Sequence, residues 1–205
     1  MDWRDRLKVY FYHRKRVKTW KDQTQESHAR SLGWSSHYAQ VARFSAIAYA
    51  TDFENRSVVD LGCGYGQLFD YLSNLYSLQH YIGVDQQAHF LKQAKAQHPD
   101  PRCEFIAGDL STVSVNSCDV VIASGSLNYK SRDENYLTKV ITHMYEMANE
   151  CVIFNLLDSS SYPEQPLLTG YNKQGVYRFC RTLSDDVVII DGYSQDDFTV
   201  VIKKH

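Results

Sequence analysis

A glycine-rich turn that follows an apolar strand is the feature that most constrains the fold of this chain. The β-branched run 56–61 is followed directly by Gly62-Cys63-Gly64-Tyr65-Gly66. Glycine lets the backbone approach a ligand closely and adopt left-handed conformations. The next run, 67–75, carries its apolar residues on one helical face, so its first turn offers free N–H groups. This strand–turn–helix unit predicts a site for a nucleotide-like ligand.

The spacing of the glycines separates two kinds of nucleotide-binding fold. Dinucleotide-binding domains favour Gly-x-Gly-x-x-Gly, in which the third glycine packs the helix against the strand. Here the spacing is Gly-x-Gly-x-Gly, it follows Asp60, and Gln67 comes after Gly66. The pattern therefore argues against a nicotinamide-dependent oxidoreductase, which stays open as an alternative.

The rest of the chain alternates between strands and helices. Strands are expected at 79–84, 103–107, 118–123 and 151–157, and helices at 87–97 and 133–148, the last capped by Asp133. Such alternation is typical of βαβ units around a parallel sheet. A helix over 172–183 then precedes two strands, 187–191 and 198–203. Their short polar connection predicts an antiparallel hairpin.

The first fifty residues are expected to form a helical cap on a domain that spans 51–205. Apolar side chains recur at helical spacing over 4–20 and 37–50, whereas the polar stretch 22–36 is expected to be a connecting loop. Residues 1–21 hold eight Lys or Arg and two Asp, a net charge of +6, although the whole chain carries −2. We favour a solvated amphipathic helix that covers the acidic body of the domain, and a nucleic-acid-binding arm is the alternative.

Further polar residues follow the later strands. Asp85 ends the second strand, about 20 residues beyond the glycine turn, where an acid can accept hydrogen bonds from ribose hydroxyls. Asp109 follows the third strand and is placed to accept from an adenine amino group. The fourth strand ends in Ser124-Gly125-Ser126. These strand ends are expected to open on one crevice, because ligands of such sheets bind beyond the carboxyl ends of the strands.

In their order and spacing these elements resemble the class I S-adenosylmethionine-dependent methyltransferases, over about residues 55–203. The resemblance implies an α/β fold, a three-layer αβα sandwich with a seven-stranded, mostly parallel sheet. The implied strand order is 3-2-1-4-5-7-6, with strand 7 antiparallel. The resemblance also implies S-adenosylmethionine as the cofactor.

The resemblance gives each motif a role. Asp60 and the glycine turn would shape the pocket for the methionine part, and Ser124 and Gly125 would lie beside the sulfonium. The stretch 33–44 is similar to the lead-in of some small bacterial methyltransferases, where an arginine meets the cofactor carboxylate; for Arg43 a surface ion pair is the alternative. The predicted cofactor-binding residues are Trp34, Arg43, Asp60, Gly62, Cys63, Gly64, Gln67, Asp85, Gln86, Gly108, Asp109, Leu110, Ser124 and Gly125.

Methyl transfer is an in-line displacement at an activated carbon, so the protein mainly positions a nucleophile and excludes water. The predicted catalytic residues, near the end of the fourth strand, are Ser126, Asn128 and Tyr129. Lys130, Asn155, His13 and His37 are further candidates, because a protonated acceptor requires a base.

The absence of several sequence motifs argues against particular classes of methyltransferase. The fourth strand lacks the Asn/Asp-Pro-Pro-Tyr motif of enzymes that methylate adenine or glutamine amides, and positions 123–127 hold no acid for a metal-dependent catechol-type site. The five scattered cysteines, with no Cys-x-x-Cys pair, are expected to be reduced and mostly buried, among them Cys103, Cys118 and Cys151. No metal site and no cytosine-type nucleophile is expected.

The acceptor is expected to contact residues 1–50 and the loop 158–171. A small molecule is favoured because no separate RNA- or protein-binding domain is evident; an RNA methyltransferase and a non-catalytic cofactor-binding protein are the alternatives. No apolar run approaches the roughly 18 residues of a membrane span, and the first residues lack a secretory signal. A cytoplasmic location follows as an expectation, while the oligomeric state stays open.

Overall fold

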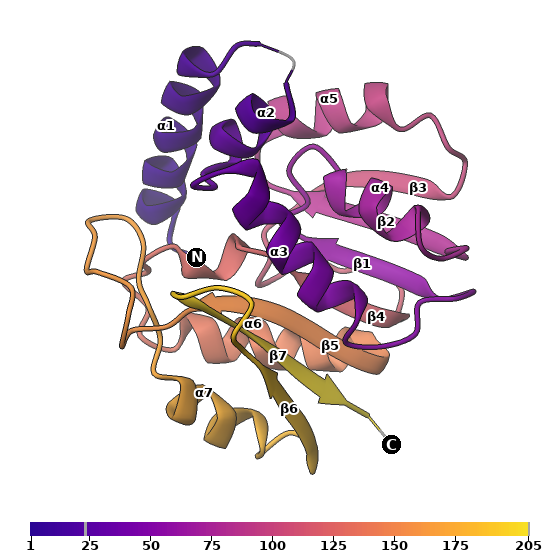
Figure 1. The fold of residues 1–205 in the computed structure, drawn as a ribbon, viewed down its shortest axis with the longest axis vertical. Coiled ribbons are helices and arrows are strands. Elements are labelled where there is room, and N and C mark those ends of the chain that lie inside the picture. The colour runs from indigo at the N-terminus through magenta and orange to yellow at the C-terminus, as the bar shows by residue number, and fades with distance from the viewer. Residues whose placement is uncertain (23, 205) are drawn as a thin grey trace.

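The computed structural model describes residues 1–22 and 24–204 and contains one seven-stranded sheet with helices on both faces (Figure 1). Its strands are β1 (Ser57–Leu61), β2 (His80–Asp85), β3 (Cys103–Ala107), β4 (Cys118–Ala123), β5 (Ala148–Leu157), β6 (Asp186–Ile190) and β7 (Asp197–Lys203). Its helices are α1 (Trp3–Thr19), α2 (Gln25–Leu32), α3 (His37–Ala48), α4 (Gln67–Ser73), α5 (Ala88–Gln97), α6 (Tyr136–Met147) and α7 (Lys173–Cys180), with a 3₁₀ turn at Ser126–Asn128.

The strand order is β3-β2-β1-β4-β5-β7-β6, as the family resemblance implied. Strands β1 to β5 pair in parallel, and β7 runs antiparallel to both β5 and β6, which confirms the C-terminal hairpin. Asp60 pairs with Gly83 on β2 and with Ile122 on β4. This register brings the carboxyl ends of the three central strands to the same edge of the sheet.

Each face of the sheet has its own core. On one face, α3, α4 and α5 bury side chains such as Phe44, Leu72 and Leu91 against the sheet. On the other, α6 and α7 bury Ile141, Met144 and other residues. The central strands are therefore covered on both sides, as their nearly continuous apolar sequences require.

The expectation of a loop over residues 22–36 is wrong, because this stretch contains helix α2. Thr24 caps the helix by accepting a hydrogen bond from the Ser27 N–H at 3.2 Å, and Gly33 ends it with φ +104°. The pattern escapes a search for apolar periodicity because the buried residues of α2 are small: Ser27, Ala29 and Ser31. The capping threonine and the terminal glycine are nevertheless ordinary boundary signals.

Other local predictions need correction. Asn135, not Asp133, occupies the N-cap position of α6; Asp133 instead pairs with Lys139 at 2.7 Å. Strand β5 begins at Ala148, three residues earlier than expected, since α6 leads directly into it. All five cysteines are unpaired, but Cys103 is only half-buried because β3 is an edge strand.

A buried ion pair joins α3 to the start of β7. The Arg43 side chain is 8% exposed, its Nε donates to Asp197 Oδ2 at 2.5 Å, and its Nη1 donates to the Ala39 carbonyl at 2.9 Å. The cap is thereby attached to the sheet, and the division of the chain near residue 50 stays a prediction. Within the described ranges, no helix has the length and apolar character needed to cross a membrane.

We predict that Asp197→Ala lowers the free energy of unfolding by about 3–5 kcal/mol, because it leaves the Arg43 charge buried without a partner. The matched control is Glu150→Ala, which breaks the exposed Arg56–Glu150 pair and should cost at most about 1 kcal/mol. Urea unfolding of both variants measures the difference. Equal losses of stability would show that the buried pair does not anchor α3.

Candidate active site

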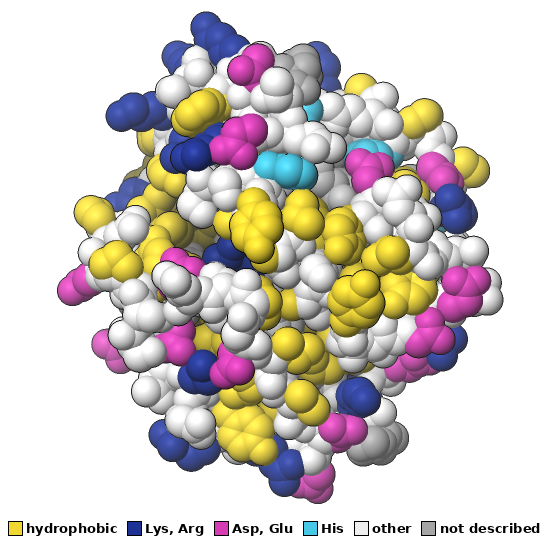
Figure 2. Space-filling model, in the orientation of Figure 1, with side chains coloured by type: hydrophobic (Ala, Val, Ile, Leu, Met, Phe, Trp, Pro, Cys, Tyr) yellow, Lys and Arg dark blue, Asp and Glu magenta, His cyan; other side chains and the backbone are white. Residues whose placement is uncertain are grey.

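A cavity lies beyond the carboxyl ends of β1, β2 and β4, and its empty space, with the open solvent at its mouth included, is about 1260 Å³. Its wall combines residues from these strand ends with residues of α1, α3 and the loop that follows β5. Figure 2 shows the surface hollowed between the foot of α1 and that loop, with hydrophobic side chains along the walls. This is the place where a parallel sheet is expected to bind its ligand.

Hydrogen bonds hold the glycine turn against β2, and Ser126 packs on the turn. The N–H groups of Gly62 and Cys63 both donate to the Val84 carbonyl, at 2.7 and 3.0 Å. A Cβ on Gly62, where φ is +90°, would lie 2.3 Å from Ser126 Cβ. The Ser126 hydroxyl donates to the Leu61 carbonyl at 2.6 Å, so this serine supports the turn and its proton is already engaged.

Two buried carboxylates face the turn. Asp85 accepts from the N–H groups of Gly64 and Gln87, at 3.0 and 2.8 Å. Asp60 accepts from the Tyr81 hydroxyl at 2.6 Å through Oδ2, while its buried Oδ1 has no partner. Burial raises the pKa of Asp60 to about 7 and that of Asp85 to about 6. Each of the two carboxyl groups can therefore still accept a hydrogen bond from a ligand.

A chain of buried hydrogen bonds starts at the floor of the cavity. Ser124 Oγ donates to Asn155 Oδ1 at 2.9 Å, and Asn155 Nδ2 donates to Thr199 Oγ1 at 2.6 Å. Thr199 donates to the Tyr193 hydroxyl, which donates to Asp197, both at 2.8 Å. Because the Ser124 proton points into this chain, the lone pairs of its oxygen face the cavity.

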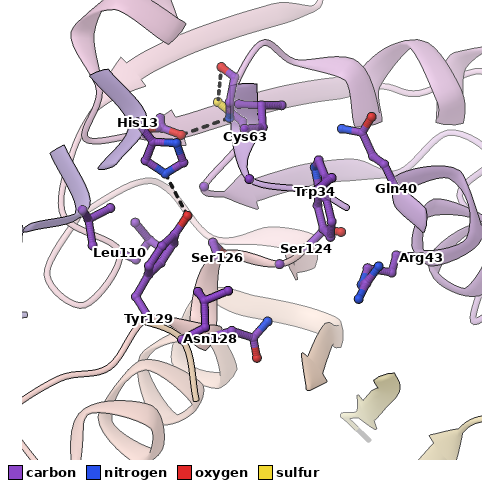
Figure 3. A pocket seen from close by; sticks show the side chains of 18 of the residues that line it. His13, Trp34, Gln40, Arg43, Cys63, Leu110, Ser124, Ser126, Asn128 and Tyr129 are labelled. Carbon is purple, nitrogen blue, oxygen red and sulfur yellow. Dashed lines mark hydrogen bonds between the residues drawn. The ribbon is translucent and has the colours of Figure 1, made fainter. Parts of the chain in front are cut away.

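Trp34 and Arg43 form the wall on the side of α3 (Figure 3). Gly125 has φ +69°, and a Cβ there would lie 2.2 Å from the Trp34 ring, so the indole packs directly on this glycine. The Arg43 guanidinium lies 4.9 Å from the Trp34 ring centroid. Arg43 thus forms an ion pair, but this pair is buried and Arg43 borders the cavity. The alternative of an ion pair on the surface is therefore wrong.

On the opposite side of the cavity, His13 of α1 is hydrogen-bonded to Tyr129, as the dashed line in Figure 3 shows. His13 Nδ1 lies 3.3 Å from the Ser31 carbonyl, which requires the proton on Nδ1. Nε2 therefore accepts from the Tyr129 hydroxyl, at 2.8 Å. Burial lowers the pKa of His13 to about 4 and raises the pKa of Tyr129 well above its usual range. The two residues form a neutral pair that holds α1 over the cavity.

Comparisons with known proteins agree with this geometry. A family model described as a methyltransferase domain matches residues 58–150. A protein of Invertebrate iridescent virus 6 that is named as a methyltransferase is 30% identical over 70 residues. That match covers 34% of this chain and 26% of the viral protein, so the chain spans about a quarter of its relative's length.

Solved structures share the fold at low sequence identity. The magnesium protoporphyrin IX methyltransferase of Synechocystis PCC 6803, with bound S-adenosylhomocysteine, is 14% identical; the superposition covers 98% of this chain and 100% of that one, with a TM-score of 0.73. An S-adenosylmethionine-dependent methyltransferase from Clostridium acetobutylicum ATCC 824 is 14% identical, with coverages of 81% and 91% and a TM-score of 0.62.

Residues 58–150 of the chain thus match a methyltransferase domain, and the fold is shared with S-adenosylmethionine-dependent methyltransferases. The sheet order and the solved structures confirm the fold predicted from the sequence, and the match over residues 58–150 agrees with the predicted family and cofactor.

The structure brings most of the predicted site residues to one cavity. Those that line it are Trp34, Arg43, Asp60, Gly62, Cys63, Gly64, Asp85, Gln86, Leu110, Ser124, Gly125, Ser126, Asn128 and Tyr129, together with His13. Their individual roles stay predictions.

Other predicted residues lie outside the cavity wall. Gln67 accepts from Gln40 Nε2 at 2.9 Å instead, and Gly108 packs against Val113. The Asp109 carboxylate accepts from the Ser111 N–H at 2.9 Å and lies 3.7 Å from Arg6 on α1. The further candidates His37, Lys130 and Asn155 do not line the cavity, although Asn155 supports Ser124 from behind.

Sequence reasoning gave residues 1–50 and the loop 158–171 as the acceptor side, but it did not single out several residues of the wall. Tyr12 comes from the inner side of α1, and Tyr162 and Leu168 come from the loop after β5. Gln87 also lines the cavity, with its buried Oε1 unpartnered. Its place two residues after Asp85 is a usable signal, whereas nothing local in the sequence marks Tyr12 or Tyr162. Over residues 1–22 and 24–204, no group of three His, Cys, Asp or Glu side chains is arranged to hold a metal ion.

We predict that the stabilising effect of His13 is lost in acid. Its pKa in the folded chain, about 4, lies below the value of 6.5 for an ordinary histidine. Between these values the unfolded chain binds a proton that the folded chain does not, so stability falls as the pH falls. The advantage of wild type over His13→Gln should shrink by about 2 kcal/mol between pH 7.5 and 5.

The control is Tyr129→Phe, which removes the same hydrogen bond without removing a group that titrates in this range. Its cost in unfolding free energy should be far less dependent on pH than that of His13→Gln. Urea unfolding at several pH values measures both. A pH-independent difference between wild type and His13→Gln would contradict the buried, neutral histidine.

Proposed function

We propose that this methyltransferase transfers the methyl group of S-adenosylmethionine to a small-molecule acceptor held inside the cavity. The observation that carries the proposal is that α1 and the loop after β5 wall the cavity on the acceptor side and leave a mouth between them. Tyr12 and His13 from the helix, and Tyr162 and Leu168 from the loop, form the wall on the side away from the glycine turn. An RNA or protein acceptor would need a more open groove.

The strand-end half of the cavity suits the cofactor. Asp85 has acceptor capacity left for the ribose hydroxyls, and the unpartnered Asp60 Oδ1 suits the ammonium group of the methionine part. Gly62 and Gly64, both with positive φ, border the cavity and allow the tight turn on which Ser126 and Leu32 pack. When bound, S-adenosylmethionine supplies a methyl carbon activated by its sulfonium.

The remaining polar groups suit positioning rather than proton removal. The lone pairs of Ser124 Oγ face the cavity. Asn128 Oδ1 accepts from the Leu157 N–H at 3.0 Å, which leaves the amide N–H₂ of Asn128 as a donor toward the cavity. Burial lowers the pKa of His13 and raises that of Tyr129, so neither serves well as a base near neutral pH. We assign Ser124 and Asn128 to positioning the acceptor, and Tyr129 to closing the site.

The acceptor class has support from a structural neighbour. The Synechocystis enzyme, whose name gives magnesium protoporphyrin IX as its acceptor, matches this chain over nearly its whole length. The basic residues of α1 that favoured an RNA acceptor, such as Arg14 and Lys18, are exposed to solvent, whereas Val9 and His13 of the same helix line the cavity. The expected cytoplasmic location remains part of this proposal.

We predict that wild type binds S-adenosylhomocysteine and that Asp85→Asn weakens this binding about 10- to 100-fold, the effect of losing hydrogen bonds to a charged group. Asp52→Asn is the matched control, since Asp52 is exposed and does not line the cavity. Isothermal titration measures the affinities, with NAD as a competing ligand class. Tighter binding of NAD than of S-adenosylhomocysteine would refute the cofactor assignment.

A second prediction concerns the acceptor. Incubation with S-adenosylmethionine labelled in the methyl group, followed by separation of a cell extract into small-molecule, RNA and protein fractions, should label the small-molecule fraction. Asp85→Asn should strongly reduce the labelling at low concentrations of S-adenosylmethionine. Label in the RNA fraction would favour the RNA alternative, and binding without any labelling would favour a non-catalytic protein.

A further inference from the structure

Helix α1 exposes an apolar stripe on its outer side. Trp3, Leu7, Tyr10 and Phe11 are 64%, 43%, 39% and 59% exposed. Their spacing along the helix places them on one face. Large exposed apolar side chains gathered on one face of a helix indicate an interaction surface rather than the scattered exposure that is normal for proteins.

The inner side of α1 is already buried, so the outer stripe is a second, separate apolar surface. Asp5, Val9 and His13, at intervals of four residues, are at most 5% exposed and face the rest of the chain. Asp5 also ties α1 to the loop that precedes α6, because its Oδ2 accepts from the Arg132 N–H at 2.9 Å. The helix is therefore held in place by its inner side, and the outer stripe is not needed to pack it.

Basic residues continue and flank the stripe. Arg14 and Lys18 lie on the same face one and two turns beyond Phe11, and Arg4 and Lys15 lie beside it. Arg14, Lys15 and Lys18 are exposed and form no ion pair within the described part of the chain. The one acid in α1, Asp5, is on the inner side. Figure 2 shows Lys and Arg side chains gathered along the edge of the molecule that α1 forms in Figure 1.

We propose that the outer face of α1, formed by Trp3, Leu7, Tyr10 and Phe11 with Arg14, Lys15 and Lys18, docks on an anionic membrane surface. A helix with an apolar face and flanking Lys and Arg lies in the plane of the bilayer interface. Trp and Tyr favour the headgroup region, and the basic side chains are attracted to anionic lipids. This inference does not depend on the identity of the methyl acceptor.

Two other occupants explain the surface less well. An RNA would use the basic side chains, but Leu7 and Phe11, in the middle of the face, would stay exposed in such a complex. A second copy of the chain would bury only a few side chains, well short of the roughly 800 Å² per partner of a stable interface. The lipid surface uses both the apolar and the basic residues.

The test is co-sedimentation of the full chain with vesicles of phosphatidylcholine alone or with about 30% phosphatidylglycerol. We expect binding to the anionic vesicles and much weaker binding to the neutral ones, with the binding reduced when NaCl is raised. Replacing Arg14, Lys15 and Lys18 by Gln should lower the partition coefficient about 100-fold, given the attraction of each basic residue to such surfaces. Leu7→Ser with Phe11→Ser should lower it at least about tenfold.

Matched controls separate the face from general exposure and charge. Tyr38 and Tyr49, which are 81% and 77% exposed on and after α3, provide an aromatic control as Tyr38→Ser with Tyr49→Ser. Exposed Lys92, Lys95 and Arg178, each changed to Gln, alter the net charge by the same amount from other helices. Both control variants should bind anionic vesicles as wild type does, and circular dichroism verifies that every variant is folded.

A direct contact readout is the blue shift of tryptophan emission on adding anionic vesicles, which Trp3→Phe should remove. Equal binding by the α1 variants and their controls would overturn the proposal, as would the absence of vesicle binding by wild type. RNA binding or dimerisation that depends on the α1 face, without vesicle binding, would likewise overturn it.

Discussion

Parallel pairing of β1 with β2 and β4 is the constraint on which the site depends. The register that sets Asp60 opposite Gly83 and Ile122 brings three strand ends to one edge, so the glycine turn, Asp85 and Ser124 border the same cavity. The turn is then fixed by hydrogen bonds to the Val84 carbonyl and by the packing of Ser126 on Gly62. The half of the site assigned to the cofactor is therefore a consequence of the sheet itself.

The other half is built by segments far apart in the sequence. The hydrogen bond between His13 and Tyr129 joins α1 to the turn after β4, and the buried Arg43–Asp197 pair joins α3 to β7. A continuous chain of hydrogen bonds runs from Ser124 to Asp197, so the floor of the cavity and the anchor of α3 belong to one polar network. The same N-terminal helix that closes the site presents a second, basic and apolar face to the outside.

The sheet and the cofactor half could be predicted because their signals are local. Strand, turn and acid follow one another within a few residues at Asp60 and again at Asp85. Helix α2 escaped prediction because its buried residues are small, even though Thr24 and Gly33 mark its ends. Asp109 also follows its strand directly, but its carboxylate contacts Arg6 and Ser111, and its role toward adenine stays a prediction.

The acceptor half could not be predicted in the same way. Tyr12 and Tyr162 reach the cavity only through the docking of α1 and the course of the loop after β5, and neither is determined by nearby sequence. The same holds for the neutral state of His13, since burial by distant residues sets its pKa.

A structure of the chain with bound S-adenosylhomocysteine tests the central claim most directly. The account predicts that the ribose hydroxyls lie within hydrogen-bond distance of Asp85 and that the ammonium group of the ligand lies against the unpartnered Asp60 Oδ1. The remaining volume, bordered by Ser124, Asn128 and Tyr129, should stay enclosed under α1. A ligand bound elsewhere, or one that leaves Asp60 and Asp85 without contact, would contradict it.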